Sequence, residues 1–307
     1  MAEKQPHNVF KQGLYPYLES KAIGIRESML DVDEAFDSKY KDLVLYDGKF
    51  PSQLFVVGRD LGKDEVEQGK PFVGDSGKLL RQSMKLAGLD ENEMFITNVV
   101  PYKPFNNEVF PPTVRSSFGA LVDVEIKIGK PRFVISVGKE STEFVLKKEV
   151  KSIISLCKSS FSVKQQVKTF GGVHSFDVIP IPHPSYYLRQ GVSANSFLNN
   201  EEYMELCVEK FKKIAGLLNS DSNVSIENQN GLSAFAPMRF LYDKEGKLEE
   251  KYVLVLNVDD KYIGGLDISK LPERFITSIQ TVDSMFRSMD EIKGAWRVYK
   301  KDKIKAR

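Results

Sequence analysis

The chain has 307 residues, of which 41% are hydrophobic and 28% are charged, and this composition excludes a largely disordered or collagen-like protein. Its 44 basic and 42 acidic residues leave a net charge of +2, which neither requires nor excludes a nucleic-acid partner. No apolar run approaches the roughly 18 residues of a membrane span, and the N-terminus lacks the apolar segment of a secretory signal, so we expect no membrane association.

Short apolar runs alternate with amphipathic segments between residues 54 and 218. The predicted strands are 54–57, 94–100, 133–137 and 176–181. The predicted helices are 76–87, 112–128, 140–148 and 196–218. This alternation predicts a three-layer α/β/α fold with a central, mostly parallel, four-stranded sheet. Ligands of such sheets bind beyond the carboxyl ends of the strands, where Gly58, Asn98 and His183 lie.

The composition changes after residue 218. Residues 219–230 are almost entirely polar and show no periodicity, which predicts a linker. The pattern of residues 231–307 predicts a small α+β module. In it, a β-hairpin with strands near 238–242 and 251–258 precedes a helical pattern and a basic tail. We therefore expect a first domain over residues 1–218, the linker, and this appended module.

Four motifs follow one another in the first domain. A strand leads into Gly58-Arg59-Asp60-Leu61-Gly62, and GKPFVGDSGKLL comes soon after it. ITNVVPYKPFNN and IPHPSYYLR follow further along the chain. Glycines after a strand let a ligand approach the backbone closely, and the start of the next helix offers free N–H groups to an anion. Taken alone, the glycines more often mark a plain strand-to-helix turn.

Together and in this order, the four motifs resemble those of the uracil-DNA glycosylase superfamily over residues 54–191. The similarity is greatest to its iron–sulfur, family 4-like branch, whose motifs read GExPG, GxPFVGxAGxLL, ITNxVKCRPPxNR and HPxYLLR. The resemblance implies an enzyme that flips a nucleotide out of DNA and hydrolyses the bond between base and sugar, which leaves an abasic site. Such an enzyme must stack the base, recognise its edge, stabilise the departing base anion and place a water against the sugar.

Three residues match base-binding positions of the superfamily. Phe72 matches the aromatic residue that stacks on the base, a contact worth about 1–3 kcal/mol. Asn98 matches the asparagine that reads the pyrimidine, because one amide can both donate to O4 and accept from N3–H. His183 matches the histidine that hydrogen-bonds O2 of the leaving base, where negative charge develops. The alternatives are a core phenylalanine, a turn-capping asparagine and a structural histidine.

Asp60 is the first candidate for handling the attacking water. The iron–sulfur branch has a small residue at this position, whereas the classical branch, with GQDPYH, has its water-activating aspartate there. A carboxylate at this position orients water and stabilises the sugar cation. Glu65 and Asn107 match other polar positions of the iron–sulfur branch and are expected to share this task. A loop-capping role is the alternative for Asp60.

Two departures from the superfamily bear on the choice of base. Arg59 replaces a glutamate or glutamine, and we expect it to bind a phosphate or a polar base substituent, or to pair with Asp60 and lower the pKa of that carboxyl group. Gly62 stands where the classical branch has the tyrosine that excludes the methyl group of thymine. Glu65 is expected to restore this barrier, and without such a barrier a pyrimidine bulkier than uracil fits.

The iron–sulfur cluster of the related branch is not expected in this chain. Tyr102 stands where that branch has a ligating cysteine, and the chain has only two cysteines, Cys157 and Cys207. A cluster needs four cysteine ligands, so we predict an enzyme without this cofactor and without a metal site. Two cysteines also cannot build a disulfide framework, which favours a reducing, cytoplasmic compartment.

The segment after His183 matches the loop that enters the minor groove of DNA in the superfamily. Tyr187 and Leu188 are the candidates for the apolar wedge that fills the space of the flipped base. Arg189 is the candidate for a phosphate contact. The alternative is a tyrosine-rich loop that packs on its own domain.

The sequence therefore predicts a monofunctional DNA glycosylase that acts as a monomer on uracil or a 5-modified pyrimidine in DNA, because no lysine stands at an evident Schiff-base position. One alternative is a glycosylase specialised for hypermodified viral bases, in defence or phage biology. A second is a catalytically silent DNA-binding subunit on the same fold, which suits the altered first motif and the basic tail. A third is an enzyme that processes free bases or nucleotides.

Overall fold

The chain is divided into two compact units in a computed structural model. The larger unit spans residues 35–225, and the smaller one combines residues 1–34 with residues 226–307. The structure describes residues 7–30, 42–104, 108–169, 172–191, 200–220, 235–240 and 251–256.

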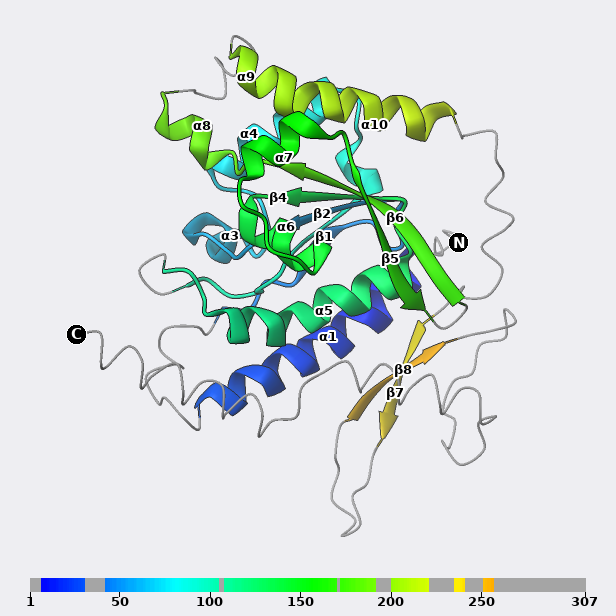
Figure 1. The fold of residues 1–307 in the computed structure, drawn as a ribbon. Coiled ribbons are helices and arrows are strands. Elements are labelled where there is room, and N and C mark those ends of the chain that lie inside the picture. Colours follow the sequence, from blue (N-terminus) through cyan, green and yellow to red (C-terminus); the bar gives the residue numbers. More distant parts are fainter. Residues whose placement is uncertain are drawn as a thin grey trace, which may run out of the picture. The chain divides into compact units, whose positions relative to one another are not determined.

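The larger unit contains a six-stranded sheet in the order β1-β3-β2-β4-β6-β5 (Figure 1). Its four inner strands run parallel, and each outer strand is antiparallel to its neighbour. The strands are β1 (Tyr46–Gly48), β2 (Leu54–Gly58), β3 (Met94–Asn98), β4 (Phe133–Val137), β5 (Val163–Thr169) and β6 (Gly172–Ile181). The predicted four-stranded parallel core is confirmed, and the two antiparallel outer strands add to it.

The outer strands lack the continuous apolar run on which the other strands were recognised. β1 has only three residues. β5 has the sequence VKQQVKT, in which every second residue is exposed. A strand with one solvated face alternates apolar and polar residues, and two valines among seven residues are too weak a pattern to separate this strand from a loop.

Helices cover both faces of the sheet, which confirms the three-layer α/β/α prediction. α4 (Asp75–Leu86), α7 (Ile153–Ser159) and α10 (Glu209–Ser220) lie on one face, and α5 (Pro112–Gly129) lies on the other (Figure 1). The connections contain the shorter helices α3 (Lys63–Gln68), α6 (Lys139–Leu146), α8 (Ser185–Arg189) and α9 (Glu201–Tyr203), and a 3₁₀ turn at Glu91–Glu93. None of the helices described is long and apolar enough to cross a bilayer.

The predicted helices agree with α4, α5 and α6 to within two residues at each end. The predicted last helix is present from residue 201 onward, and a π-helical turn, Met204–Val208, joins α9 to α10. Its first predicted residues, 196–199, lie outside the described residues. The short helices α3, α7 and α8 have too few residues for a helical period to be recognised in the sequence.

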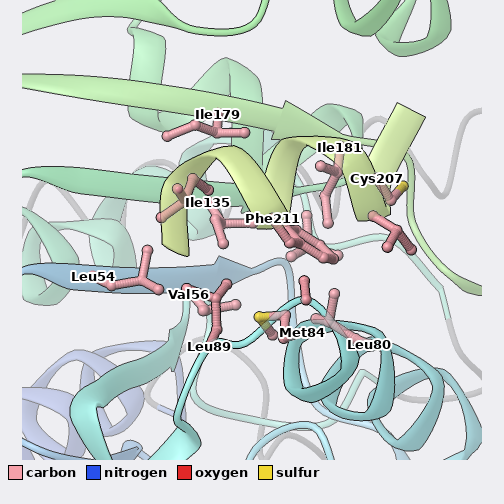
Figure 2. Packing of buried hydrophobic residues seen from close by; sticks show 14 of the residues in the cluster. Leu54, Val56, Leu80, Met84, Leu89, Ile135, Ile179, Ile181, Cys207 and Phe211 are labelled. Atoms are coloured by element: carbon pink, nitrogen blue, oxygen red, sulfur yellow. The ribbon is translucent and has the colours of Figure 1, made fainter. Parts of the chain in front are cut away.

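One face of the sheet packs against α4 and α10 as a single apolar cluster. Every second residue of the inner strands points into it, namely Leu54, Val56, Met94, Ile96, Phe133, Ile135, Val137, Ile179 and Ile181. Figure 2 shows Phe211 of α10 and Met84 of α4 packed with strand residues of this face. Burying a side chain of this size stabilises the fold by about 1.5–3 kcal/mol. The cluster therefore fixes the strands whose ends form the site.

The opposite face packs aromatic rings beneath α5. Phe55 of β2 and Phe95 of β3 have ring centroids 4.6 Å apart, and Phe50 lies 5.1 Å from Phe95. A Cβ atom on Gly129, at the end of α5, would lie 2.5 Å from the Phe55 ring. The absence of a side chain there lets the helix end approach the rings closely.

The smaller unit is described in α1 (His7–Leu30), β7 (Phe235–Phe240) and β8 (Lys251–Leu256). β7 and β8 pair antiparallel, in agreement with the predicted hairpin, and α1 contacts both strands.

Residues 1–34, which the sequence pattern assigned to the first domain, are grouped here with the C-terminal part, while the other boundary falls inside the predicted linker. The predicted later helix and the basic tail lie outside the described residues. The assignment of a catalytic domain, a linker and an appended module stays a prediction.

Candidate active site

Predicted site residues from three strands lie at the carboxyl edge of the parallel sheet. Gly58 at the end of β2 pairs in register with Asn98 at the end of β3. Arg59 and Asp60 follow Gly58, and His183 lies two residues beyond the end of β6. The connection after β2 leads to α4 on one face, whereas the connection after β3 leads to α5 on the other (Figure 1). Ligands of open α/β sheets bind where neighbouring connections diverge in this way.

Gly58 lets two predicted base-binding side chains meet over the end of β2. A Cβ atom at this position would lie 2.1 Å from Oδ1 of Asn98 and 2.6 Å from Cζ of Phe72. No side chain fits into this space, so the close approach itself requires a glycine. The structure thus brings together the predicted stacking aromatic and the predicted base-reading amide.

The Asn98 amide is available to a ligand. The residue is buried, with 4% of its surface exposed, and no group among the described residues hydrogen-bonds its side chain. A side-chain amide offers both a donor and an acceptor. This favours binding of a group that accepts and donates side by side, as the edge of a pyrimidine does.

The Asp60 carboxylate is oriented by its neighbour in the sequence. Its Oδ2 accepts a hydrogen bond from Nε of Arg59 at 2.7 Å, and 9% of the Asp60 side chain is exposed. Nη1 of Arg59 also lies 3.9 Å from Oε1 of Glu140 on α6. Among the roles expected for Arg59, this geometry favours pairing with Asp60.

The pKa of Asp60 is raised above the ordinary value of 3.8. Burial, which disfavours the charged form, has the largest effect, and Glu140 raises the pKa as well. The charge and the hydrogen bond of Arg59 lower it, as does the charge of Arg115. The expectation that Arg59 lowers this pKa holds for its own contribution, but the net shift is upward because desolvation outweighs it.

The hydrogen bonds of His183 fix which ring nitrogen has the proton. The backbone N–H of Ser185 donates to Nδ1 at 3.2 Å, and the Ser185 hydroxyl lies 2.8 Å from the same atom. Because a backbone N–H can only donate, Nδ1 must accept, and the proton of the neutral ring is on Nε2. No described residue hydrogen-bonds Nε2, so this N–H can donate to a ligand.

We expect His183 to stay neutral until the pH falls to about 4. Burial, helped by the charges of Arg59 and Arg189 and opposed by Glu140, lowers its pKa from 6.5 to about 4. The unfolded chain binds this proton near pH 6.5 and the folded chain only near pH 4, so stability is lost as the pH falls between these values. Nitrogen-15 NMR of the labelled ring should show the proton on Nε2 above pH 5. If the His183 ring titrated near pH 6.5, the lowered pKa would be contradicted.

Glu65 binds the loop that contains Phe72. Its Oε1 accepts from the N–H groups of Val73 and Gly74, at 3.0 and 2.9 Å, and its Oε2 accepts from the N–H of Gly62 at 3.0 Å. A Cβ atom on Gly62 would lie 2.4 Å from Oε2, so this glycine makes room for the contact. Both carboxylate oxygens accept from backbone N–H groups, so Glu65 positions this loop, and its expected share in water handling stays a prediction.

Comparison with known proteins identifies the family of this chain. A family model described as the uracil DNA glycosylase superfamily matches residues 46–212, more than half of the chain. The chain belongs to the uracil DNA glycosylase superfamily. The match includes all four parallel strands and the site residues at their ends, and it confirms the predicted class of enzyme, a DNA glycosylase.

Type-4 uracil-DNA glycosylases are among the curated members of the superfamily that resemble this chain. The protein of Sulfurisphaera tokodaii is 29% identical over 180 residues, which cover 57% of this chain and 74% of the relative. That of Thermotoga maritima is 28% identical over 148 residues, 48% of this chain and 72% of the relative. That of Saccharolobus solfataricus is 26% identical over 183 residues, 59% of this chain and 78% of the relative. The predicted place in the family 4-like branch is confirmed.

The iron–sulfur cluster expected of that superfamily branch does not fit the cysteines of this chain. Clusters bind four cysteine thiolates, and the chain has two cysteines. The Cys157 thiol donates to the carbonyl oxygen of Pro180 at 3.0 Å, and burial raises its pKa to about 11. Burial raises the pKa of Cys207 as well. Both groups are therefore stabilised as thiols and not as thiolate ligands.

Tyr102, at the position of a ligating cysteine of the superfamily branch, is part of the core. It is 1% exposed, and its ring centroid lies 5.4 Å from that of Phe118 on α5. Among the described residues, no three histidine, cysteine, aspartate or glutamate side chains gather into a metal site. Aromatic packing thus occupies the position where the related proteins are expected to bind iron.

Tyr187 lies in the core of the protein. Its side chain is fully buried, and its ring lies 4.7 Å from Tyr203 and 5.1 Å from Tyr186, edge-on to both. A wedge must enter the duplex, so this burial disfavours Tyr187 as the wedge, and that role stays a prediction. Leu188 is partly buried against the same apolar cluster, and Arg189 is exposed. Tyr186, with 36% of its surface exposed, is the accessible tyrosine of this helix.

Tyr187→Phe is expected to leave excision unchanged and to raise the free energy of unfolding by about 1 kcal/mol. The Tyr187 hydroxyl is buried and has no hydrogen-bond partner among the described residues, so its removal ends an unfavourable burial. Urea denaturation measures the change. Tyr203→Phe is the matched control, since that hydroxyl lies 2.8 Å from Oγ of Ser83 and its removal should not stabilise the protein. A folded Tyr187→Phe variant without activity would contradict a core role.

The site also contains residues that sequence reasoning missed. Ser185, which fixes the ring of His183, had a recognisable signal, because a hydroxyl two residues away can reach back to a side chain. Glu140 had no signal in the sequence, because only the fold brings the start of α6 close to Arg59. Asn107 lies outside the described residues, so its role in handling water stays a prediction.

Proposed function

We propose that this protein is a monofunctional DNA glycosylase that hydrolyses the N-glycosidic bond of uracil in DNA. The names of the curated relatives, type-4 uracil-DNA glycosylases, support uracil as the base. The strongest support from geometry is the Nε2–H of His183 at the same sheet edge as a carboxylate, Asp60, and an amide, Asn98, where no described residue hydrogen-bonds this N–H or the amide. The N–H can stabilise the leaving base, the carboxylate can stabilise the sugar cation, and the amide can recognise the pyrimidine edge.

Recognition of the flipped base rests on two side chains over Gly58. Phe72 offers an aromatic ring on which any planar base stacks, and stacking does not distinguish bases. The Asn98 amide supplies the selection, because its oxygen accepts from N3–H of uracil while its NH₂ donates to O4. Cytosine presents the opposite pattern at these two atoms, so the amide favours uracil.

Bond cleavage then depends on His183 and Asp60. As the glycosidic bond breaks, negative charge grows on O2 of the base and positive charge grows on the sugar. His183 donates from Nε2 to O2, and because Nδ1 accepts from the Ser185 N–H, the proton of the neutral ring stays on Nε2. The Asp60 carboxylate stabilises the sugar cation and orients the water that attacks the anomeric carbon.

A second candidate substrate is a 5-substituted pyrimidine. Gly62 presents no side chain, and Glu65 turns both of its oxygens to backbone N–H groups. Neither Gly62 nor Glu65 then directs a side-chain group toward the base to exclude a substituent at position 5 of the pyrimidine. Hypermodified pyrimidines of viral DNA belong to this substrate class.

An excision assay with alkaline strand cleavage tests both candidates. The full chain is incubated with single- and double-stranded oligonucleotides that contain one uracil, thymine, 5-hydroxymethylpyrimidine or glucosylated pyrimidine. Cleavage at uracil supports the first proposal, and cleavage only at a substituted base supports the second. DNA binding without abasic sites on any substrate would overturn both in favour of a silent DNA-binding subunit.

A further inference from the structure

We propose that Arg81 is a positioning residue that holds the base-stacking ring of Phe72 in place through the backbone of Pro71 and Phe72. The inference rests on the proposed function, in which Phe72 stacks on the flipped base. Arg81 lies on α4, directly after the second sequence motif, and nothing in the sequence pattern indicates a role for it.

Phe72 has a backbone conformation that is unfavourable for a residue with a side chain. Its φ angle is 57°, in the left-handed region that glycine adopts readily and other residues rarely. Such conformations persist where the surroundings impose them, and they gather at functional sites. The conformation directs the ring to the space above Gly58, beside Asn98. Its restraints are therefore part of the base-binding apparatus.

Arg81 binds two successive carbonyl groups of this turn. Its Nε donates to the carbonyl oxygen of Phe72 at 2.9 Å, and its Nη2 donates to that of Pro71 at 3.0 Å. The guanidinium group also pairs with Asp47 at 3.3 Å and Glu91 at 3.0 Å, and 19% of the side chain is exposed. A planar guanidinium fixes two acceptors in one geometry, which an ammonium group does not reproduce.

Two other residues restrain the same turn from different directions. Glu65 accepts from the N–H groups of Val73 and Gly74, the two residues after Phe72. Gly77 of α4 touches the Phe72 backbone, since a Cβ atom there would lie 2.1 Å from the Phe72 carbonyl carbon. Arg81 thus binds the carbonyl side of the turn and Glu65 its amide side. Together these contacts fix the direction of the ring.

Arg81→Lys tests the proposal in the wild-type and Phe72→Ala backgrounds. With Phe72 present, the substitution should lower kcat/KM for excision about tenfold, because a displaced ring stacks poorly. With Phe72→Ala, it should cause no further loss, since no ring remains to be positioned. An equal loss in both backgrounds would show that Arg81 acts on activity by another route, and would overturn the proposal.

Arg132→Lys is the matched control for this pair of variants. Arg132 also donates to a backbone carbonyl, that of Leu217 at 3.1 Å, but it precedes β4, at the amino end of the parallel strands. We expect its kcat/KM to remain that of the wild type. A loss as large as that of Arg81→Lys would mean that any such arginine affects activity through general stability, which would also overturn the proposal.

Carbon-13 NMR of labelled phenylalanine gives a second readout that does not need activity. The ring signal of Phe72, assigned by its absence in Phe72→Ala, should shift in Arg81→Lys and stay unchanged in Arg132→Lys. If the wild type forms no abasic sites while this shift occurs, the proposed function fails and positioning by Arg81 stands. If the ring signal does not shift, positioning by Arg81 is refuted whatever the activity.

Discussion

Asp60→Asn is expected to lower kcat/KM for base excision about 10³-fold, the range over which general-base and electrostatic contributions are usually found. Asparagine keeps the size of the side chain but removes the negative charge opposite the developing sugar cation. Only 9% of the Asp60 side chain is exposed, so bulk water cannot replace the lost charge. Single-turnover excision from a uracil-containing oligonucleotide measures the effect directly.

The matched control for this substitution is Asp123→Asn on α5. Asp123 also pairs with a cation, Lys147 at 2.7 Å, but it lies at the surface, with 29% of the side chain exposed. Surface ion pairs contribute little, so activity within about twofold of the wild type is expected. If folded Asp60→Asn protein kept more than about a tenth of the wild-type rate, Asp60 could not have the role proposed here.

The same substitution should change the acid side of the pH profile. In the proposed mechanism the carboxylate is the active form of Asp60. Its pKa is raised above 3.8 by burial, so it takes up a proton at a higher pH than an ordinary aspartate. Wild-type kcat/KM should therefore fall as the pH drops through this raised pKa. In Asp60→Asn only the protonation of His183, near pH 4, should remain.

Gly58→Ala is expected to lower kcat/KM more than about 100-fold, because it displaces both residues that are proposed to bind the base. The added methyl group would meet Asn98 at 2.1 Å and Phe72 at 2.6 Å, and neither side chain can stay in place. Overpacking of this kind also destabilises the fold by about 1–3 kcal/mol. Excision is therefore measured well below the melting temperature of the variant.

Gly216→Ala on α10 is the control for Gly58→Ala. A Cβ atom at Gly216 meets no atom within 4 Å, so this variant should keep full activity and gain stability from the better helix former. If Gly58→Ala protein excised uracil at the wild-type rate, the approach of Asn98 and Phe72 over β2 would not be needed for base binding. Unchanged binding of DNA by the variant would place its defect in base recognition.

The carboxyl ends of the parallel strands are the part of the site that the sequence predicts best. Each inner strand is an uninterrupted apolar run, so its end is visible, and the residues that follow it are at the ligand-binding edge. Gly58, Asn98 and His183 could be placed by this reasoning. The sequence also shows why these positions need a glycine, an amide and an imidazole once the family motifs are recognised.

Contacts between distant residues and the burial of short helices are less predictable. Oε1 of Glu65 accepts from backbone N–H groups eight and nine residues away, and no residue pattern reports such a contact. α8 has five residues, too few for periodicity to distinguish its buried side from its exposed side, which is why Tyr187 was taken for a surface residue. The left-handed conformation of Phe72 is likewise invisible, because the residue type argues against it.

The divergence of the connections after β2 and β3 has a consequence for how the enzyme can change during evolution. The segment after β2 contains Asp60, Glu65 and Phe72, whereas Asn98 and His183 are at the ends of other strands. Insertions or substitutions from α3 to α4, beyond Asp60, alter the contacts of Phe72 without displacing His183, the residue proposed to stabilise the departing base. In the proposed mechanism, the stacking contact with the base can therefore change in that one segment, while edge recognition by Asn98 and bond cleavage by His183 and Asp60 are inherited unchanged.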